Sequence, residues 1–232
     1  MRRLSNFKLI MANSSTQPEV AAAYNRWAAT YDADHNRTRD MAAVVLRQAN
    51  LVSADQNILE IGCGTGRNTQ WLAERSGNIV AMDFSEEMLR VARSRVQAPS
   101  VRFVQHDIRL AWPVEDDSLE VVIAMLVLEH IEFLEPIFAE AARVLRPGGE
   151  LFFCELHPTR QMSGRQAEFG SGDTGEPERI TAFLHDTSDY LNSGLHAGFE
   201  LIHLGEWRDA ETNKSELPRL LSVHMRLAHL HA

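Results

Sequence analysis

The sequence predicts an α/β fold in which a mostly parallel sheet carries helices on both of its faces. Short runs rich in β-branched residues alternate with helical segments between residues 57 and 156, the order typical of parallel sheets. The chain of 232 residues is long enough to bury a sizeable core and is predicted to be one domain. Two further alternating runs near the C-terminus suit a hairpin that closes one edge of the sheet.

The elements follow from local patterns. Residues 17–50 are predicted to be helical, because Tyr24, Trp27 and Tyr31 recur on one helical face and "MAAVVLRQANL" forms a second, apolar helix. The predicted strands are "NILEIG", "NIVAMDFS", "VRFVQHD", "LEVVIAMLVL" and "GELFFCEL". The helices between them are "NTQWLAERS", "EEMLRVARSRV" and "LEPIFAEAARVL", and "RPGGE" is interpreted as the turn into the fifth strand.

The rest of the chain is less regular. Residues 158–182 are rich in Gly, Ser, Thr and charge without periodicity, which predicts a long surface flap. "TSDYLNSGLHAGF" predicts a helix that ends at Gly198, and "ELIHLGEW" and "LLSVHMRLA" predict the closing hairpin. Residues 1–16 are expected to be disordered, and Met11 is an alternative start, so no function is assigned to residues 1–10.

Composition disfavours several classes of partner. With 23 Lys and Arg against 32 Asp and Glu, the net charge of −9 disfavours nucleic acid and anionic membranes as partners. No apolar stretch of 18 residues is present, so no membrane span is predicted. Cys63 and Cys154 indicate neither a disulfide framework nor a metal site, and we expect a reduced, cytoplasmic protein. Its oligomeric state, monomer or homodimer, is left open.

The stretch "LEIGCGTGR" carries glycines at positions 62, 64 and 66 between a strand and a helix, where glycine lets a ligand approach the backbone. A dinucleotide fingerprint would need its third glycine where Arg67 stands. Glu60, just before the loop, would repel a pyrophosphate. The pattern therefore favours a phosphate-free ligand with an adenosine and a cationic centre over a nicotinamide cofactor, although a plain structural turn is an alternative.

"LEIGCGTG" resembles the first motif of the class I S-adenosylmethionine-dependent methyltransferases. "VAMDFSEEML", "VQHDI", "VVIAMLVLEHI" and "RVLRPGGELFFCE" are similar to the later motifs of that family, at its intervals, across residues 57–157. "YNRWAATYD" is similar to the cap helix of a subgroup that includes the quinone-biosynthesis methyltransferases. The resemblance implies a Rossmann-like, seven-stranded sheet whose last strand is antiparallel. It also implies a core over residues 57–157 and S-adenosylmethionine as cofactor, with S-adenosylhomocysteine as product. The predicted single domain of residues 1–232 further holds the helical cap at 17–50, the flap at 158–182 and a closing helix and hairpin at 183–232, which the local patterns indicate.

Cofactor residues are assigned from the resemblance and from side-chain chemistry. Asp83 ends the second strand, where a carboxylate accepts hydrogen bonds from ribose hydroxyls, and Asp107 ends the third, where the family binds the adenine amino group. A helix cap and a solvated acid are the respective alternatives, and core packing is the alternative for the aromatic stripe. Arg37 is a further candidate for the cofactor carboxylate. The cofactor-binding candidates are Tyr24, Tyr31, Glu60, Gly62, Cys63, Gly64, Gly66, Asp83, Phe84, Met88, Asp107, Ile108 and Met125.

Methyl transfer from a sulfonium requires mainly that the acceptor be aligned and desolvated, so a general base is optional. The catalytic candidates are His130, after the fourth strand, and His157, held extended by the proline that follows it. An ordinary helix-start or loop histidine is the alternative for both. The substrate candidates are Glu129, Glu155, Arg160, Arg165 and Tyr190.

The predicted function is methyl transfer to a small-molecule acceptor, with oxygen, nitrogen and carbon all open as the receiving atom. Two alternatives remain, a non-catalytic protein that binds S-adenosylmethionine and an enzyme that methyl-esterifies an acyl group on a carrier protein.

Overall fold

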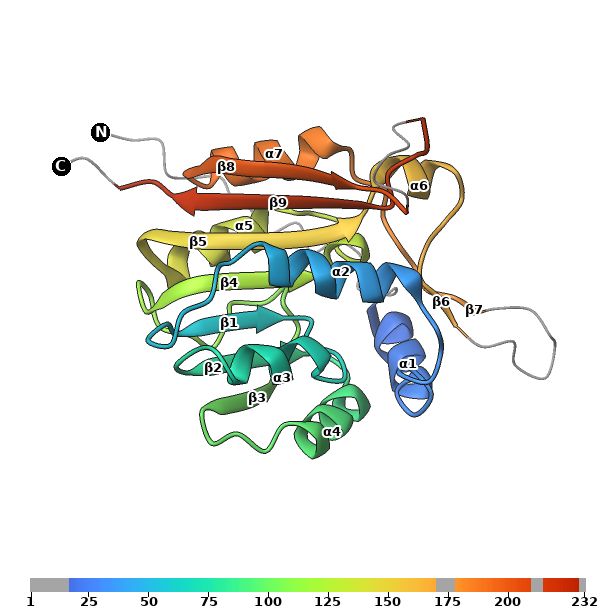
Figure 1. The fold of residues 1–232 in the computed structure, drawn as a ribbon, viewed down its shortest axis with the longest axis horizontal. Coiled ribbons are helices and arrows are strands. Elements are labelled where there is room, and N and C mark those ends of the chain that lie inside the picture. The colour runs from blue at the N-terminus through green and yellow to red at the C-terminus, as the bar shows by residue number, and fades with distance from the viewer. Residues whose placement is uncertain (1–16, 170–177, 210–214, 230–232) are drawn as a thin grey trace.

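A seven-stranded sheet forms the centre of the computed structural model, which describes residues 17–169, 178–209 and 215–229 (Figure 1). Its strand order is β3-β2-β1-β4-β5-β9-β8. The strands are β1 (Ile58–Ile61), β2 (Ile79–Asp83), β3 (Val101–Gln105), β4 (Leu119–Met125), β5 (Leu145–Leu156), β8 (Phe199–Trp207) and β9 (Leu220–Leu227). The first five pair in parallel, whereas β9 runs antiparallel to both β5 and β8. The predicted mostly parallel sheet and closing hairpin are thus confirmed; residues 1–16 lie outside the described residues.

The segment predicted as a turn before the fifth strand is instead part of β5. Leu145 already pairs with Leu119 of β4, and the next pair of the register is Glu150 with Val121. Residues 146–149 therefore bulge opposite Glu120, so Pro and Gly interrupt the ladder without ending the strand. The predicted boundary was wrong because a bulge and a turn use the same residue types.

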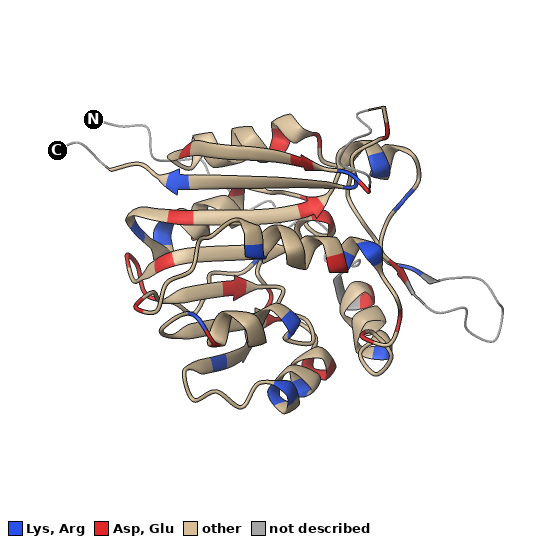
Figure 2. Cartoon of the chain, viewed as in Figure 1, with Lys and Arg blue, Asp and Glu red and all other residues tan. Residues whose placement is uncertain are grey.

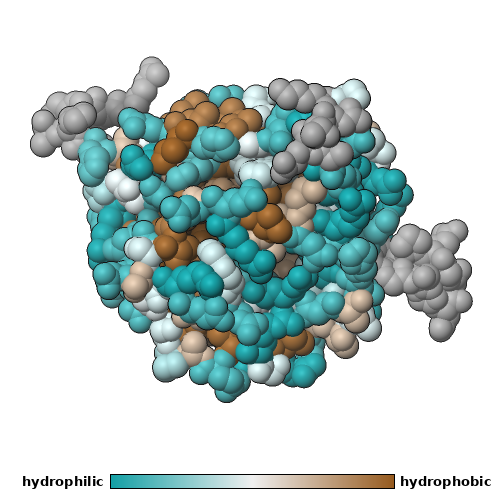
Figure 3. Space-filling view, viewed as in Figure 1, coloured by the Kyte–Doolittle hydropathy of each residue, from teal (hydrophilic) through white to brown (hydrophobic). Residues whose placement is uncertain are grey.

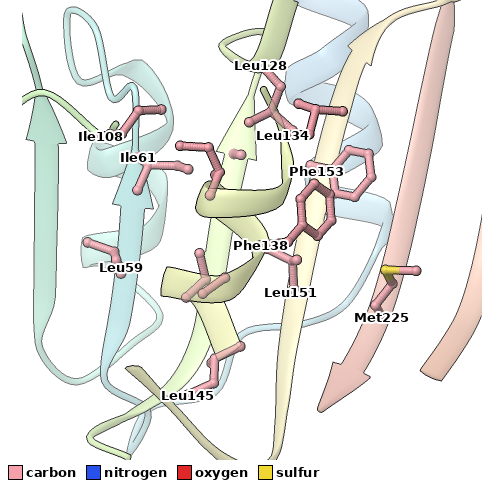
Figure 4. Packing of buried hydrophobic residues seen from close by; sticks show 14 of the residues in the cluster. Leu59, Ile61, Ile108, Leu128, Leu134, Phe138, Leu145, Leu151, Phe153 and Met225 are labelled. Carbon is pink, nitrogen blue, oxygen red and sulfur yellow. The ribbon is translucent and has the colours of Figure 1, made fainter. Parts of the chain in front are cut away.

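Helices cover both faces of the sheet, as predicted. They are α1 (Gln17–Trp27), α2 (Arg37–Gln48), α3 (Arg67–Ala73), α4 (Glu86–Arg95), α5 (Glu135–Val144), α6 (Pro158–Met162) and α7 (Thr187–His196), with a short 3₁₀ helix at Leu128–His130. Alternate strand residues feed two cores, because side chains alternate across a sheet. Leu59 and Ile61 pack on the face of α5 with Phe138 and Phe153 (Figure 4), whereas Ile58 packs on the face of α2 and α3.

The predicted helical cap consists of two helices that meet at an angle (Figure 1). The first ends at Trp27, and Asn36 caps the second by accepting a hydrogen bond of 3.0 Å from the backbone N–H of Arg39. Trp27 is buried with Val20 and Ala23, so core packing is the correct interpretation for this member of the aromatic stripe. Helix α1 stands beside the carboxyl ends of the strands, where open α/β sheets bind ligands.

The described part of the flap holds α6 and a two-stranded hairpin of β6 (Glu168–Phe169) and β7 (Glu178–Arg179), and residues 170–177 lie outside it. None of the described helices is long and apolar enough to cross a bilayer. The face shown in Figure 3 is largely hydrophilic, and its hydrophobic patches are separated from one another.

Candidate active site

The carboxyl ends of β1, β2, β3 and β4 surround a cavity beside α1, which we call the central cavity. Its lining residues are Tyr24, Tyr31, Gly62, Gly64, Asp83, Phe84, Met88, His106, Asp107, Ile108, Met125, Leu126, Val127, His130 and Ile131. The structure therefore brings together all of the predicted cofactor residues except Glu60, Cys63 and Gly66. His106, Leu126, Val127 and Ile131 were not predicted, although each adjoins a predicted motif residue.

The three glycines of the loop have different surroundings. A Cβ on Gly62 would lie 2.5 Å from Val127 Cγ2, whereas a Cβ on Gly64 would meet no atom of the described residues within 4 Å. A Cβ on Gly66 would lie 3.0 Å from the Cβ of Ala92 in α4, away from the central cavity. Gly64 thus borders open space, and the close approach at Gly66 is made by a helix. Gly62 and Gly64 therefore line the central cavity, whereas Gly66 does not.

Asp83 ties the glycine loop to β2. Its carboxylate accepts hydrogen bonds from the backbone N–H groups of Gly64 at 2.8 Å and Ser85 at 2.9 Å. Ser85, not Asp83, caps α4, because its hydroxyl accepts the N–H of Met88 at 3.1 Å. The helix-cap interpretation of Asp83 is therefore wrong, and burial raises the pKa of its carboxyl to about 6.

Asp107 follows the end of β3 and lines that end of the central cavity. Arg109 holds its carboxylate through several N–H···O contacts, the shortest of 2.6 Å. Burial alone would raise the pKa of Asp107, but these contacts keep it below its usual value. An ionised acceptor is thus fixed at this end of the cavity.

Glu60 does not line the central cavity. It is 2% exposed, and its carboxylate accepts a hydrogen bond of 2.5 Å from the Thr69 hydroxyl of α3. Burial raises the pKa of Glu60 to about 8, so the group is mostly protonated at neutral pH. The expected repulsion of phosphates by its charge is therefore corrected, because the buried carboxyl carries little charge.

His130 reaches the cavity from the 3₁₀ helix after β4. Its Nδ1 lies 2.7 Å from the carbonyl oxygen of Thr181, and its Nε2 lies 2.8 Å from the hydroxyl of Tyr24. Because a carbonyl only accepts, Nδ1 donates to Thr181, which leaves Nε2 to pair with the tyrosine hydroxyl. A role as base would require Tyr24 to release this nitrogen.

Three of the other candidates lie away from the described cavities. His157 caps α6, with Nδ1 accepting the backbone N–H of Thr159 at 3.2 Å. Glu155 is fully buried and accepts the backbone N–H groups of Val127 and Leu128 at 3.1 Å each. Tyr190 is fully buried against Phe153. Their positions give them structural roles in place of the expected contacts with substrate.

Two clefts adjoin the central cavity. The loop cleft is lined by Tyr31, Arg39, Ala42, Ala43, Gly62, Cys63, Gly64, Thr65, Arg67, Asn68, Met125 and Leu126. The cap cleft, with a volume of about 440 Å³, is lined by Tyr24, Trp27, Tyr31, His35, Asn36, Arg37, Thr38, Arg39, Leu126, Glu129, Leu156, Arg160, Arg165, Gln166, Ala167, Glu168 and Arg219. It brings together the substrate candidates Glu129, Arg160 and Arg165.

Tyr31 and Leu126 line all three spaces and mark the point where they meet. Leu126 has φ of 55°, a left-handed conformation that is uncommon for a leucine. Arg39 lines both clefts, with its guanidinium over the ring of Tyr31, and its buried Nε has no hydrogen-bond partner within the described part of the chain. No local pattern predicted Arg39, which lies in the polar first turn of α2.

A family model described as "Methyltransferase domain" matches residues 59–153, the core that carries the cavity. An uncharacterized methyltransferase of Emericella nidulans is 32% identical over 80% of this chain and 77% of its own length. The chain belongs to the class I S-adenosylmethionine-dependent methyltransferases. A demethylmenaquinone methyltransferase of Clavibacter sepedonicus is 33% identical over 90% of this chain and 84% of its own.

This methyltransferase also shares its fold with a solved structure described as the DhpI-SAH complex, with a TM-score of 0.71, 21% identity, and coverage of 93% of this chain and 99% of that one. The residues around the central cavity fit S-adenosylmethionine on their own chemistry. The open space at Gly64 leaves room for a ligand, and the unpaired Nε of Arg39 offers a donor for a carboxylate.

Proposed function

We propose that this methyltransferase transfers the methyl group of S-adenosylmethionine to a small-molecule acceptor that binds in the cap cleft. The observation that carries the proposal is that Tyr31 and Leu126 line the central cavity and both clefts. A ligand in the central cavity and a second ligand in the cap cleft would therefore meet at these two residues.

In this proposal, the central cavity holds the adenosine and the loop cleft holds the amino-acid end. Asp83 accepts hydrogen bonds from the ribose hydroxyls, since its carboxylate lines the central cavity at the end of β2. Asp107 accepts a hydrogen bond from the adenine amino group. Phe84 and Met88 cover one face of the adenine ring. Arg39, in place of Arg37, binds the carboxylate of S-adenosylmethionine, because Arg39 lines the loop cleft beside the glycine loop and Arg37 does not.

S-adenosylmethionine supplies a methyl group on a sulfonium, an activated electrophile that needs no further activation by the protein. The chain itself contributes alignment and exclusion of water. Tyr24 and Tyr31 present aromatic rings to the cavity, which favour a cationic centre. Helix α1, held against His130 by the Tyr24 hydroxyl, keeps solvent from that side.

The direct test is calorimetric titration of the protein with S-adenosylhomocysteine, with NAD as the comparison ligand. Tight binding of the first and none of the second supports the proposal, and the reverse would sink it. A screen of metabolite extracts with an isotopically labelled methyl donor then identifies the acceptor. Labelled small molecules support the proposal, whereas label found only on a carrier protein favours the esterification alternative.

We also propose a cytoplasmic location. Cys63 and Cys154 are both buried free thiols, as expected of a protein kept in a reducing compartment. Fractionation of cells that express the tagged protein checks this directly.

A further inference from the structure

The cap cleft is unusually rich in arginine. Arg37, Arg39, Arg160, Arg165 and Arg219 line it, although the chain as a whole has a net charge of −9. Figure 2 shows basic segments at the N-terminal end of α2, on α6 and at the start of β9, all toward one side of the molecule. Three separate elements thus direct positive charge to the same cleft.

The carboxylate of Asp209 contacts three of these arginines. Arg219 donates hydrogen bonds to both of its oxygens, at 2.7 and 2.6 Å. Arg160 and Arg37 approach the same carboxylate at only 3.4 and 3.6 Å. A single negative charge cannot neutralise three guanidinium groups, so positive charge remains in excess.

Arg165 adds a further positive charge. It is exposed at the cleft, and its guanidinium has no partner among the described residues. Its backbone is held beside α6, because its N–H donates a hydrogen bond of 3.1 Å to the carbonyl of Arg160. The chain thus fixes the position of this arginine while leaving its charged group available.

The two acids that line the cleft do not cancel this excess. The Glu168 carboxylate lies 4.0 Å from the Nε of Arg179, an arginine that does not line the cleft, so part of its charge is balanced there. The side chain of Glu129 is only 6% exposed and accepts a hydrogen bond of 3.2 Å from Gln161, whereas Arg37 is 63% exposed. The carboxylate of Glu129 therefore lies in the inner wall of the cleft, whereas Arg37 and Arg165 are exposed at its mouth and Arg160 is partly exposed.

We propose that the methyl acceptor carries an anionic group, a carboxylate or a phosphate, which Arg165, Arg37 and Arg160 bind at the mouth of the cap cleft. The atom that receives the methyl group then lies inward, toward Tyr31 and Leu126. Guanidinium groups suit this task because their N–H donors match the paired oxygens of both anions. This inference rests on the proposed function of the same cleft.

The first test needs no identified acceptor. Citrate and inorganic phosphate are titrated by calorimetry into the protein, with and without S-adenosylhomocysteine. We expect at least one of them to bind, and Arg165→Gln together with Arg37→Gln to weaken it by roughly 10- to 100-fold. Arg47→Gln is the matched control, because Arg47 is exposed on α2 outside the cleft lining. Absence of binding by both anions, or equal losses in the control, overturns the inference.

The second test uses labelled methyl donor with a panel of small hydroxy and amino acids, phosphorylated alcohols and their neutral amides or alcohols. Acidic members should be methylated, and Arg165→Gln should raise KM about tenfold or more with little change in kcat. Methylation confined to neutral acceptors overturns this inference but leaves the proposed function standing. If the unaltered protein does not bind S-adenosylhomocysteine, the proposed function is overturned instead.

Discussion

The Tyr24 hydroxyl and His130 Nε2 lie 2.8 Å apart and join α1 to the segment after β4 across 106 residues of sequence. The Nδ1 of the same imidazole donates a hydrogen bond to the carbonyl of Thr181, which lies just after β7 of the flap hairpin. One buried ring therefore connects three segments around the central cavity. The cap and the cavity should respond together to any change at this contact.

Removing the Tyr24 hydroxyl tests this connection. Tyr24→Phe keeps the ring but leaves the buried Nε2 of His130 without this contact, so we expect the free energy of unfolding to fall by about 1–2 kcal/mol. Affinity for S-adenosylhomocysteine should fall severalfold, because the cap is held less firmly. Urea denaturation and calorimetry measure the two effects.

Tyr190→Phe provides the control. The hydroxyl of Tyr190 is buried and has no hydrogen-bond partner among the described residues, so its removal should cost little or should stabilise the protein. Equal losses of stability in the two variants would contradict the assigned role of the contact between Tyr24 and His130.

Cofactor binding should weaken in mild acid. Burial raises the pKa of Asp83 to about 6 in the free protein, and the ribose contact requires the ionised carboxylate. Lowering the pH below 6 therefore adds a proton that must be released before binding. Affinity for S-adenosylhomocysteine at pH 5 should be about tenfold lower than at pH 7.

Asp83→Asn identifies the group responsible. The variant should bind weakly at all pH values and should lose the acid dependence, since its amide does not titrate. Calorimetry in two buffers of different ionisation enthalpy also measures proton release on binding to the unaltered protein near pH 6. A pH profile that is the same in the variant would assign the titration to another group.

The two glycines that face the central cavity should separate stability from binding. In Gly62→Ala the new Cβ would lie 2.5 Å from Val127 Cγ2 at φ of 67°, which should lower the free energy of unfolding by about 2–4 kcal/mol. In Gly64→Ala the Cβ meets no atom of the described chain within 4 Å, so only the cost of φ of 54° remains, about 1–2 kcal/mol.

The Cβ of Gly64→Ala would, however, occupy space proposed for the ligand. Its affinity for S-adenosylhomocysteine should fall more than tenfold at a temperature where the variant is fully folded, which a thermal melt establishes first. Binding equal to that of the unaltered protein would place the ligand elsewhere.

The sequence allowed prediction of most of the sheet, because buried parallel strands read as apolar runs separated by periodic helices. The positions of Asp83 and Asp107 at the same edge as the glycine loop could also be predicted, because the carboxyl ends of parallel strands lie at one edge of the sheet. The sequence did not predict that β9 lies between β5 and β8. That order depends on long-range pairs such as Glu150 with Arg226, which leave no local pattern.

Burial accounts for three of the errors in the predicted site, and long-range folding accounts for a fourth. Glu60 was treated as charged, but its low exposure keeps it mostly protonated. Glu155 and Tyr190 were expected to face a substrate, yet both lie within the core. Arg39 was overlooked because its place depends on how the cap folds back onto the glycine loop, where it donates to the carbonyl of Tyr31.

Glu155 makes the stability of the fold depend on pH. Burial, with the nearby charge of Glu129, raises the pKa of Glu155 to about 8 from an ordinary 4.5, and one of its oxygens has no hydrogen-bond partner in the segments that the structure describes. A raised folded-state pKa stabilises the protein below the unfolded pKa, and this contribution is lost as the pH rises through 8. Glu155→Gln, which keeps an acceptor for the N–H groups of Val127 and Leu128, should therefore be more stable than the unaltered protein at pH 8.5, by about 1–2 kcal/mol. Near pH 5 the two should be similar, because Glu155 is then protonated in the folded state. Urea denaturation at both pH values measures the difference, and a variant that is less stable at pH 8.5 would show that the ionised carboxylate stabilises the turn after β4.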